Sequence, residues 1–165
     1  MNAQEMIKVD KEKVGEYVSR FHGAVFRLAF SYVKNREDAE DISQEAFLRL
    51  YRSDKPFPSD NDVKAWLMRV TINLSKDLLR SAWFKGRAEL DENIPCENNE
   101  EIALLEWIKK LRPEYSAVIH LFYYEGYSVK EIAKICRISE TAVTTRLSRA
   151  RKQLKEMLSN NERND

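Results

Sequence analysis

The sequence contains few of the residues that interrupt helices. Its 165 residues include four glycines and four prolines, and it has no low-complexity tract, which excludes a collagen-like or wholly disordered chain. No apolar run approaches the ~18 residues that a membrane-spanning helix needs. Residues 1–10 lack a basic stretch followed by an apolar one, so we expect no secretory signal. These absences predict a cytoplasmic protein without membrane insertion.

Cysteine and net charge are also scarce. The two cysteines, Cys96 and Cys136, are far apart and have no second Cys or His at metal-ligand spacing, so we expect plain thiols in a reducing compartment. The 28 Lys and Arg nearly balance the 27 Asp and Glu, for a net charge of +1. Overall charge therefore favours neither nucleic acid nor membrane as a partner, and a surface that binds polyanions must arise from local segregation of charge.

Apolar residues recur at helical spacing almost throughout, and strand-like alternation is missing. The spacing predicts three helices in the first half, at about residues 11–34, 36–52 and 62–84. In the second half, Pro113 fits the first turn of a helix that Gly126 stops. The fold class that follows is all-α, with two small helical domains.

The composition changes after Gly86. Residues 89–106 hold seven acidic residues and no Lys or Arg, which is typical of a linker. We therefore predict an N-terminal domain at 1–86, an acidic linker at 87–104 and a C-terminal domain at 105–165.

The C-terminal domain carries a helix-turn-helix pattern. Ser128 and Glu131 fit a capping box at the start of a short helix that runs to Ile135. A brief turn follows, and Ser139 can cap a long helix. A short helix, a tight turn and a long helix form the helix-turn-helix arrangement that places its second helix in the major groove.

Positive charge collects in two islands. Residues 61–88 carry six basic and two acidic residues, and residues 128–158 carry eight and three. In the second island, the residues expected to contact bases and phosphates are Ser128, Thr141, Thr144, Thr145, Arg146, Arg149 and Lys152. A solvated basic face on an ordinary helical hairpin is the alternative.

The first island mixes basic residues with aromatic ones, a combination that favours unpaired nucleic acid. Phe57, in the loop before it, is a candidate stacking residue. Trp66 continues the apolar stripe and is expected in the core, whereas Trp83 and Phe84 lie beyond the stripe and are candidates for exposure.

Acidic residues cluster at the start of the second predicted helix, where Glu37, Asp38, Glu40, Asp41 and Glu45 fall within nine residues. Carboxylates there suit the helix dipole, which explains at least part of the cluster. The sharper interpretation is a docking surface for a basic partner. Both readings stay open at this point.

Three segments resemble sigma factors, in the order in which that family has them. The segment that resembles the polymerase-binding helix contains Asp38, Ala39, Asp41, Gln44, Glu45, Phe47 and Leu50. The segment that resembles the promoter-melting helix contains Ala65, Trp66, Leu67, Val70, Asn73, Asp77, Leu79 and Arg80. The segment that resembles the C-terminal DNA-binding domain contains Leu111, Arg112, Pro113, Gly126, Tyr127, Ser128, Glu131, Ile132, Ala133, Val143, Arg146, Leu147, Arg149, Ala150 and Arg151. The two-domain length resembles the extracytoplasmic-function group of the sigma-seventy family.

The resemblance implies a subunit that binds core RNA polymerase, selects promoters and helps to melt them, with no catalytic residue, cofactor or metal. It implies polymerase contacts through Asp38, Asp41, Gln44, Glu45 and Phe47. It also implies an anti-sigma factor as a further partner, by analogy.

For DNA, the resemblance implies that the helix-turn-helix reads the minus-thirty-five element. It implies that the loop at residues 53–61, with Phe57, catches a base flipped from the minus-ten element. Asn73, Asp77 and Arg80 match positions near the melted strand, although Asp77 could equally pair with Arg80 within the helix.

Two positions depart from the family pattern. Arg137 stands where the turn usually has glycine, and a left-handed backbone is costlier for arginine. Ala142 replaces a common threonine. Both lie at or beside the reading helix, so the promoter sequence cannot be copied from relatives.

Two other classes of protein remain to be weighed. A stand-alone helix-turn-helix regulator would leave the acidic second helix and the aromatic-basic third helix without a role. An enzyme acting on nucleic acid would need a catalytic cluster, but His22 and His120 lie on mostly apolar helices and are expected to be packed residues.

The acidic linker adds a hypothesis of its own, that it covers the basic islands of the free protein, with a plain solvated spacer as the alternative.

Overall fold

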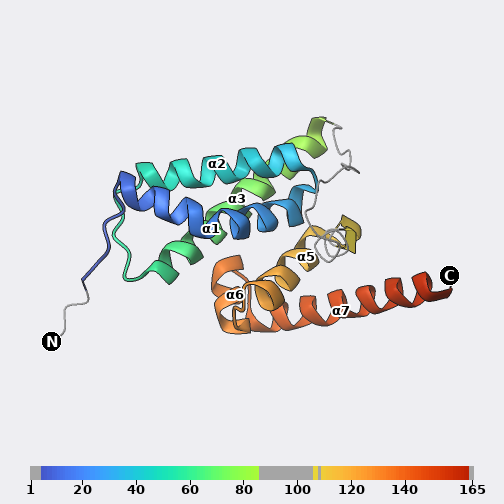
Figure 1. Cartoon of the computed structure of the whole chain (residues 1–165). Coiled ribbons are helices and arrows are strands. Elements are labelled where there is room, and N and C mark those ends of the chain that lie inside the picture. The colour runs from blue at the N-terminus through green and yellow to red at the C-terminus, as the bar shows by residue number, and fades with distance from the viewer. Residues whose placement is uncertain (1–4, 86–105, 108, 164–165) are drawn as a thin grey trace.

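The computed structural model describes residues 5–85, 106–107 and 109–163, and in these parts the chain is built from helices (Figure 1). The first three are α1 (Lys11–Val33), α2 (Arg36–Arg52) and α3 (Asp60–Lys85). They are followed by α5 (Pro113–Ile119), the π-helical turn η1 (His120–Tyr124), α6 (Val129–Cys136) and α7 (Glu140–Arg163). The all-α fold class is confirmed.

The first three helices begin and end close to their predicted bounds because local signals fix them. Asp10 caps α1 by accepting a hydrogen bond from the Lys13 backbone N–H at 2.9 Å. Lys34 ends the helix with a left-handed backbone, at φ 59°. Asn35 then caps α2, so that α1 and α2 are joined by a tight connection.

A single apolar core holds α1, α2 and α3 together. Val25 and Leu28 of α1, Leu50 of α2, and Val63 and Leu67 of α3 are all fully buried. These residues recur at the three- and four-residue spacing seen in the sequence, which places one apolar face of each helix inward.

The C-terminal helices are also set by local signals. Ser128 and Glu131 form the predicted capping box, with the Ser128 hydroxyl accepting from the Glu131 N–H at 3.1 Å and the Glu131 carboxylate accepting from the Ser128 N–H at 3.3 Å. Gly126 has φ 74°, a left-handed conformation that favours glycine, and it ends the preceding helical segment as predicted. Arg137 is left-handed too, at φ 55°, so the conformation expected to be costly for arginine is the one that the turn adopts.

Two features were not predicted. The segment from His120 to Tyr124 is π-helical rather than α-helical. The extended N-terminal segment forms an isolated antiparallel bridge between Ile7 and Phe57.

The two groups of helices pack directly on each other. Besides contacts within each group, α1 contacts α5 and η1, and α3 contacts α6. In Figure 1, α5 and α6 lie beneath the three N-terminal helices, and the red α7 extends away along the lower side. No helix in the described parts is long and apolar enough to cross a membrane.

The acidic linker falls outside the described residues, as do Cys96 and the masking hypothesis that rests on the linker. The side chains of Trp83 and Phe84, predicted to be exposed, are also outside the description.

Candidate nucleic-acid and partner interfaces

The first turn of α2 uses part of its acidic cluster for capping. The Asn35 Oδ1 accepts from the Asp38 backbone N–H at 2.8 Å, and the Asn35 amide donates to the Asp38 carboxylate at 2.7 Å. Asp38 is half-buried in this arrangement. Helix capping therefore explains Asp38 at least in part.

The remaining carboxylates of α2 have no comparable structural task. Asp41 is exposed, and so is Gln44, three residues further along the same face. Glu45 lies 3.3 Å from Arg49 in an ion pair whose side chains are 40% and 50% exposed. Such surface pairs contribute little to stability, so Glu45 remains available to a partner.

Phe47 does not belong with these exposed residues. It is 6% exposed and packs in the core, at the base of a shallow groove between α1 and α2 that Val14, Val18, Leu48 and Tyr51 also line. Leu48 and Tyr51 are 45% and 50% exposed and were missed in the sequence. The signal was their position: both fall outside the apolar stripe that α2 turns to the core.

Phe57 also differs from its predicted role. Its side chain is 2% exposed and meets the Trp66 ring edge-on at a centroid distance of 5.8 Å. The backbones of Phe57 and Ile7 exchange two hydrogen bonds, of 2.6 and 2.9 Å. Phe57 thus anchors the loop to the core, whereas its neighbours Asp54, Lys55 and Asn61 are exposed.

We expect Phe57→Ala to destabilise the fold by about 3–5 kcal/mol, because it removes a buried ring and leaves a cavity against Trp66. Urea unfolding followed by circular dichroism measures the loss. Lys55→Ala, an exposed change in the same loop, is the control and should leave stability within about 0.5 kcal/mol. Equal stability of Phe57→Ala and the parent chain would contradict the packing role.

Asn73, Asp77 and Arg80 share an exposed face of α3. Asp77 Oδ1 and Arg80 Nη1 are 3.9 Å apart, and both side chains are 74% exposed. At that length and exposure the ion pair is weak, so it does not remove either residue from a possible contact with DNA. The structure brings the three predicted residues together as one solvent-facing polar row.

The predicted reading helix is α7. Ser139 caps it by accepting from the Ala142 N–H at 3.0 Å. Its first turns expose the predicted residues Thr141, Thr144 and Thr145, and further along the helix Arg149 and Lys152 are exposed. The hydroxyl of Thr144 donates to the Glu140 carbonyl at 3.0 Å, and that of Ser128 serves the capping box of α6, so both of these hydroxyls have structural partners.

Arg146 and Arg149 are not equivalent. Arg149 is exposed, whereas Arg146 is half-buried on the side of α7 that faces the rest of the molecule. Burial raises the pKa of the Cys136 thiol to about 11, and the positive charge of Arg146 opposes that rise. Arg149 is therefore the more accessible of the two arginines. The sequence did not distinguish them, because they carry the same charge on the same helix.

The two histidines occupy different environments. His120 is 2% exposed, and burial lowers the pKa of its imidazole despite the nearby Glu125 carboxylate. His22 is half-exposed, with its Nε2 3.5 Å from Glu40 of α2. Across the described residues, no group of three or more His, Cys, Asp or Glu side chains could hold a metal ion.

Comparison with known proteins matches both halves of the chain to one family. Residues 17–85 match the family described as Sigma-70 region 2, and residues 101–154 match the one described as Sigma-70, region 4. Among curated proteins, SigV of Bacillus subtilis is 32% identical over 136 residues, covering 79% of this chain and 81% of that protein. SigW of the same organism is 28% identical over 175 residues, covering 94% of each chain. SigE of Mycolicibacterium smegmatis is 31% identical over 159 residues, which cover 87% of this chain but 60% of that protein.

Solved structures share the fold. The sigma factor RpoE, in complex with the anti-sigma factor NepR from Bartonella quintana, aligns with a TM-score of 0.78 at 21% identity, covering 90% of this chain and 98% of that one. CnrH, in complex with the cytosolic domain of CnrY, aligns with a TM-score of 0.64 at 25% identity, covering 90% and 89%.

The fold and the exposed polar faces of α2, α3 and α7 define a two-part helical protein with a helix-turn-helix. The sequence matches make the class specific: the chain belongs to the extracytoplasmic-function group of the sigma-seventy family. Its role is that of a transcription initiation sigma factor.

Proposed function

We propose that this chain binds core RNA polymerase through the exposed face of α2 and reads the minus-thirty-five element with α7. We further propose that α3 contacts the opened minus-ten strand. The observation that carries the proposal is the segregation of charge on exposed helix faces. Asp41, Gln44 and Glu45 face solvent on α2, whereas Arg149 and Lys152 do so on α7.

The acidic face suits a basic partner because complementary charges steer encounter and oppose wrong partners. Leu48 and Tyr51 continue this face as exposed apolar residues. An interface with an apolar centre and a charged rim is the usual arrangement in protein complexes. We include Leu48 and Tyr51 among the proposed polymerase contacts and leave Phe47 out, because it is buried.

On the DNA side, the exposed row Thr141, Thr145, Arg149 and Lys152 runs along α7 at the i, i+4, i+8, i+11 spacing of one helix face. Threonine and arginine near the start of such a helix can reach base edges, and lysine further along can meet phosphates. The role proposed is binding and positioning, without catalysis, at the site of transcription in the cytoplasm.

An anti-sigma factor is a further proposed partner. RpoE and CnrH, which share this fold, are each described in complex with a second protein, NepR and the cytosolic domain of CnrY. The apolar groove between α1 and α2 is exposed here and would suit a partner helix.

Binding of the purified chain to duplex promoter DNA, measured with and without core polymerase, tests the proposed function. We expect specific binding only when polymerase is present. Equally tight and specific binding of the chain alone would instead support the stand-alone regulator, for which the acidic face of α2 has no use.

A further inference from the structure

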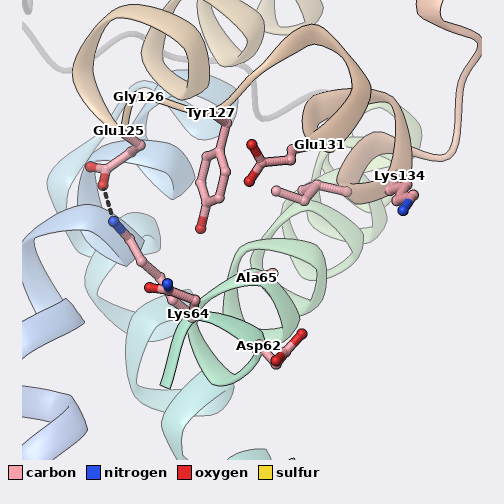
Figure 2. A pocket seen from close by; sticks show the side chains of 10 residues that line it. Asp62, Lys64, Ala65, Glu125, Gly126, Tyr127, Glu131 and Lys134 are labelled. Atoms are coloured by element: carbon pink, nitrogen blue, oxygen red, sulfur yellow. Dashed lines mark ion pairs between the residues drawn. The ribbon is translucent and has the colours of Figure 1, made fainter. Parts of the chain in front are cut away.

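One carboxylate joins the two groups of helices. Glu125 follows η1, and its side chain is 6% exposed. Its Oε2 lies 2.6 Å from the Lys64 Nζ of α3, and its Oε1 lies 3.4 Å from the Arg27 Nη2 of α1. Figure 2 shows Glu125 and Lys64, which both line a pocket, pointing toward each other, with Tyr127 beside them. A single acidic residue of the C-terminal group thus pairs with cations from two N-terminal helices.

The π-helical turn positions this carboxylate. The Glu125 N–H donates to the His120 carbonyl at 3.0 Å, which closes the turn, and the His120 Nε2 lies 3.3 Å from the Glu125 Oε1. π-Turns within helices are rare and often occur at functional positions. Aromatic rings complete the contact: Arg27 lies over Tyr124 at 4.5 Å and Lys64 over Tyr127 at 5.6 Å from the ring centroids.

Charge at Glu125 is strongly favoured in this setting. Burial alone would raise the pKa of its carboxyl, but the adjacent Lys64 ammonium and His120 imidazole lower it to about 2. The carboxylate is therefore ionised at neutral pH. A buried carboxylate needs its cations, because an unpaired charge away from water is costly.

Two further polar contacts cross the same boundary. The Ser116 hydroxyl of α5 donates to the Ser31 carbonyl of α1 at 2.9 Å. The Lys34 ammonium, at the end of α1, donates to the carbonyls of Leu111 and Lys109. Burial lowers the pKa of Lys34 to about 8. The boundary is thus a built interface with several specific polar partners.

This closed arrangement conflicts with promoter binding. The minus-ten and minus-thirty-five elements are about 25 base pairs apart, or roughly 85 Å at about 3.4 Å per base pair. A compact chain of this length has a radius of gyration of roughly 15 Å. With α3 and α6 in contact, α3 and α7 cannot occupy both elements at once. This step rests on the proposed function.

We propose that Glu125 is an interdomain latch, which through Lys64 and Arg27 holds the free sigma factor closed and opposes its assembly with core polymerase. Opening exposes the carboxylate and both cations to water, so it removes contacts without leaving any charge buried. Polymerase then binds the open chain, and the closed population reduces the apparent affinity in proportion.

Small-angle X-ray scattering of the full chain, without polymerase or DNA, tests the latch. Glu125→Lys places a third cation against Arg27 and Lys64, so we expect the radius of gyration to rise by several ångströms with helicity unchanged. Glu125→Gln should give a smaller rise. Reversal of Lys64 in the same chain, Glu125→Lys with Lys64→Glu, should restore part of the compaction. Glu156→Lys, an equal change of charge at an exposed position of α7, is the control and should stay compact.

An unchanged radius of gyration for Glu125→Gln and Glu125→Lys would overturn the latch. If Glu125→Lys lost its helicity, Glu125→Gln and the paired reversal would decide in its place. The inhibitory role has a separate readout, the affinity for core polymerase: Glu125→Lys should bind roughly tenfold more tightly if nine-tenths of the parent chain is closed. Opening without any gain in affinity would overturn that role. Neither outcome depends on promoter activity, so a failure of the proposed function is seen separately, as an absence of polymerase binding by every variant.

Discussion

Replacement of Asp41 and Glu45 by lysine should weaken binding to core polymerase about tenfold or more, because four units of charge change on the face that we assign to a basic partner. Both residues lie on α2 outside its apolar core stripe, so the fold should remain intact. Titration of labelled chain with core polymerase measures the affinity. The dependence of the affinity on salt should also become less steep, since screening acts mainly on exposed charges.

Glu12→Lys with Glu16→Lys is the matched control for this variant. Both residues are exposed on α1, in the same half of the chain, and the change in net charge is identical. We expect near-parental affinity. If the α2 variant bound polymerase as tightly as this control, with its helicity intact, the acidic face would have no role beyond capping and solvation.

The second large effect concerns Arg149. We expect Arg149→Ala to reduce transcription from promoters that depend on a minus-thirty-five element by about 5- to 150-fold, the range of one specific base contact of ~1–3 kcal/mol. Opening on a premelted template should persist, since α3 is untouched. Run-off transcription on the two templates measures the difference.

Arg112→Ala is the control for this experiment, because Arg112 is an exposed arginine of the same half whose side chain is 67% accessible. Equal losses on both templates would show that Arg149 supports the fold or the polymerase contact and does not read DNA.

Arg146→Ala should also lower protein stability, since its side chain is half-buried, and this separates it from Arg149.

Local signals explain why most of the helices could be predicted. The capping box at Ser128 and Glu131 and the cap at Ser139 involve residues at most three positions apart. A sequence displays such interactions directly, because they form wherever the backbone turns into a helix. The left-handed backbone of Arg137 was expected from a different source, the resemblance to a family that usually has glycine at this turn.

Contacts between residues far apart in the sequence could not be predicted from local patterns. Phe57 lies in a segment that the sequence predicts to be a loop, where exposure is expected. Its backbone pairing with Ile7 and its packing on Trp66 place it in the core instead. Glu125 is one acidic residue among many in the sequence. Its partners Arg27 and Lys64 are 98 and 61 positions away, and no local pattern connects them.

Helical spacing also does not show where the buried face of a helix ends and its exposed face begins. Phe47 and Leu48 are adjacent apolar residues of α2, yet Phe47 is 6% exposed and Leu48 is 45% exposed. The difference arises from how α1 packs against α2, which depends on the tertiary arrangement. The same uncertainty separates Arg146 from Arg149 on α7.

In vitro transcription tests the central claim most directly. Core RNA polymerase from the source organism, incubated with a pool of its genomic fragments, should produce transcripts from a discrete set of promoters only when this chain is added. Those start sites should share two sequence elements centred near minus-ten and minus-thirty-five. Identical transcripts with and without the chain, although it is folded and present in excess, would contradict the account.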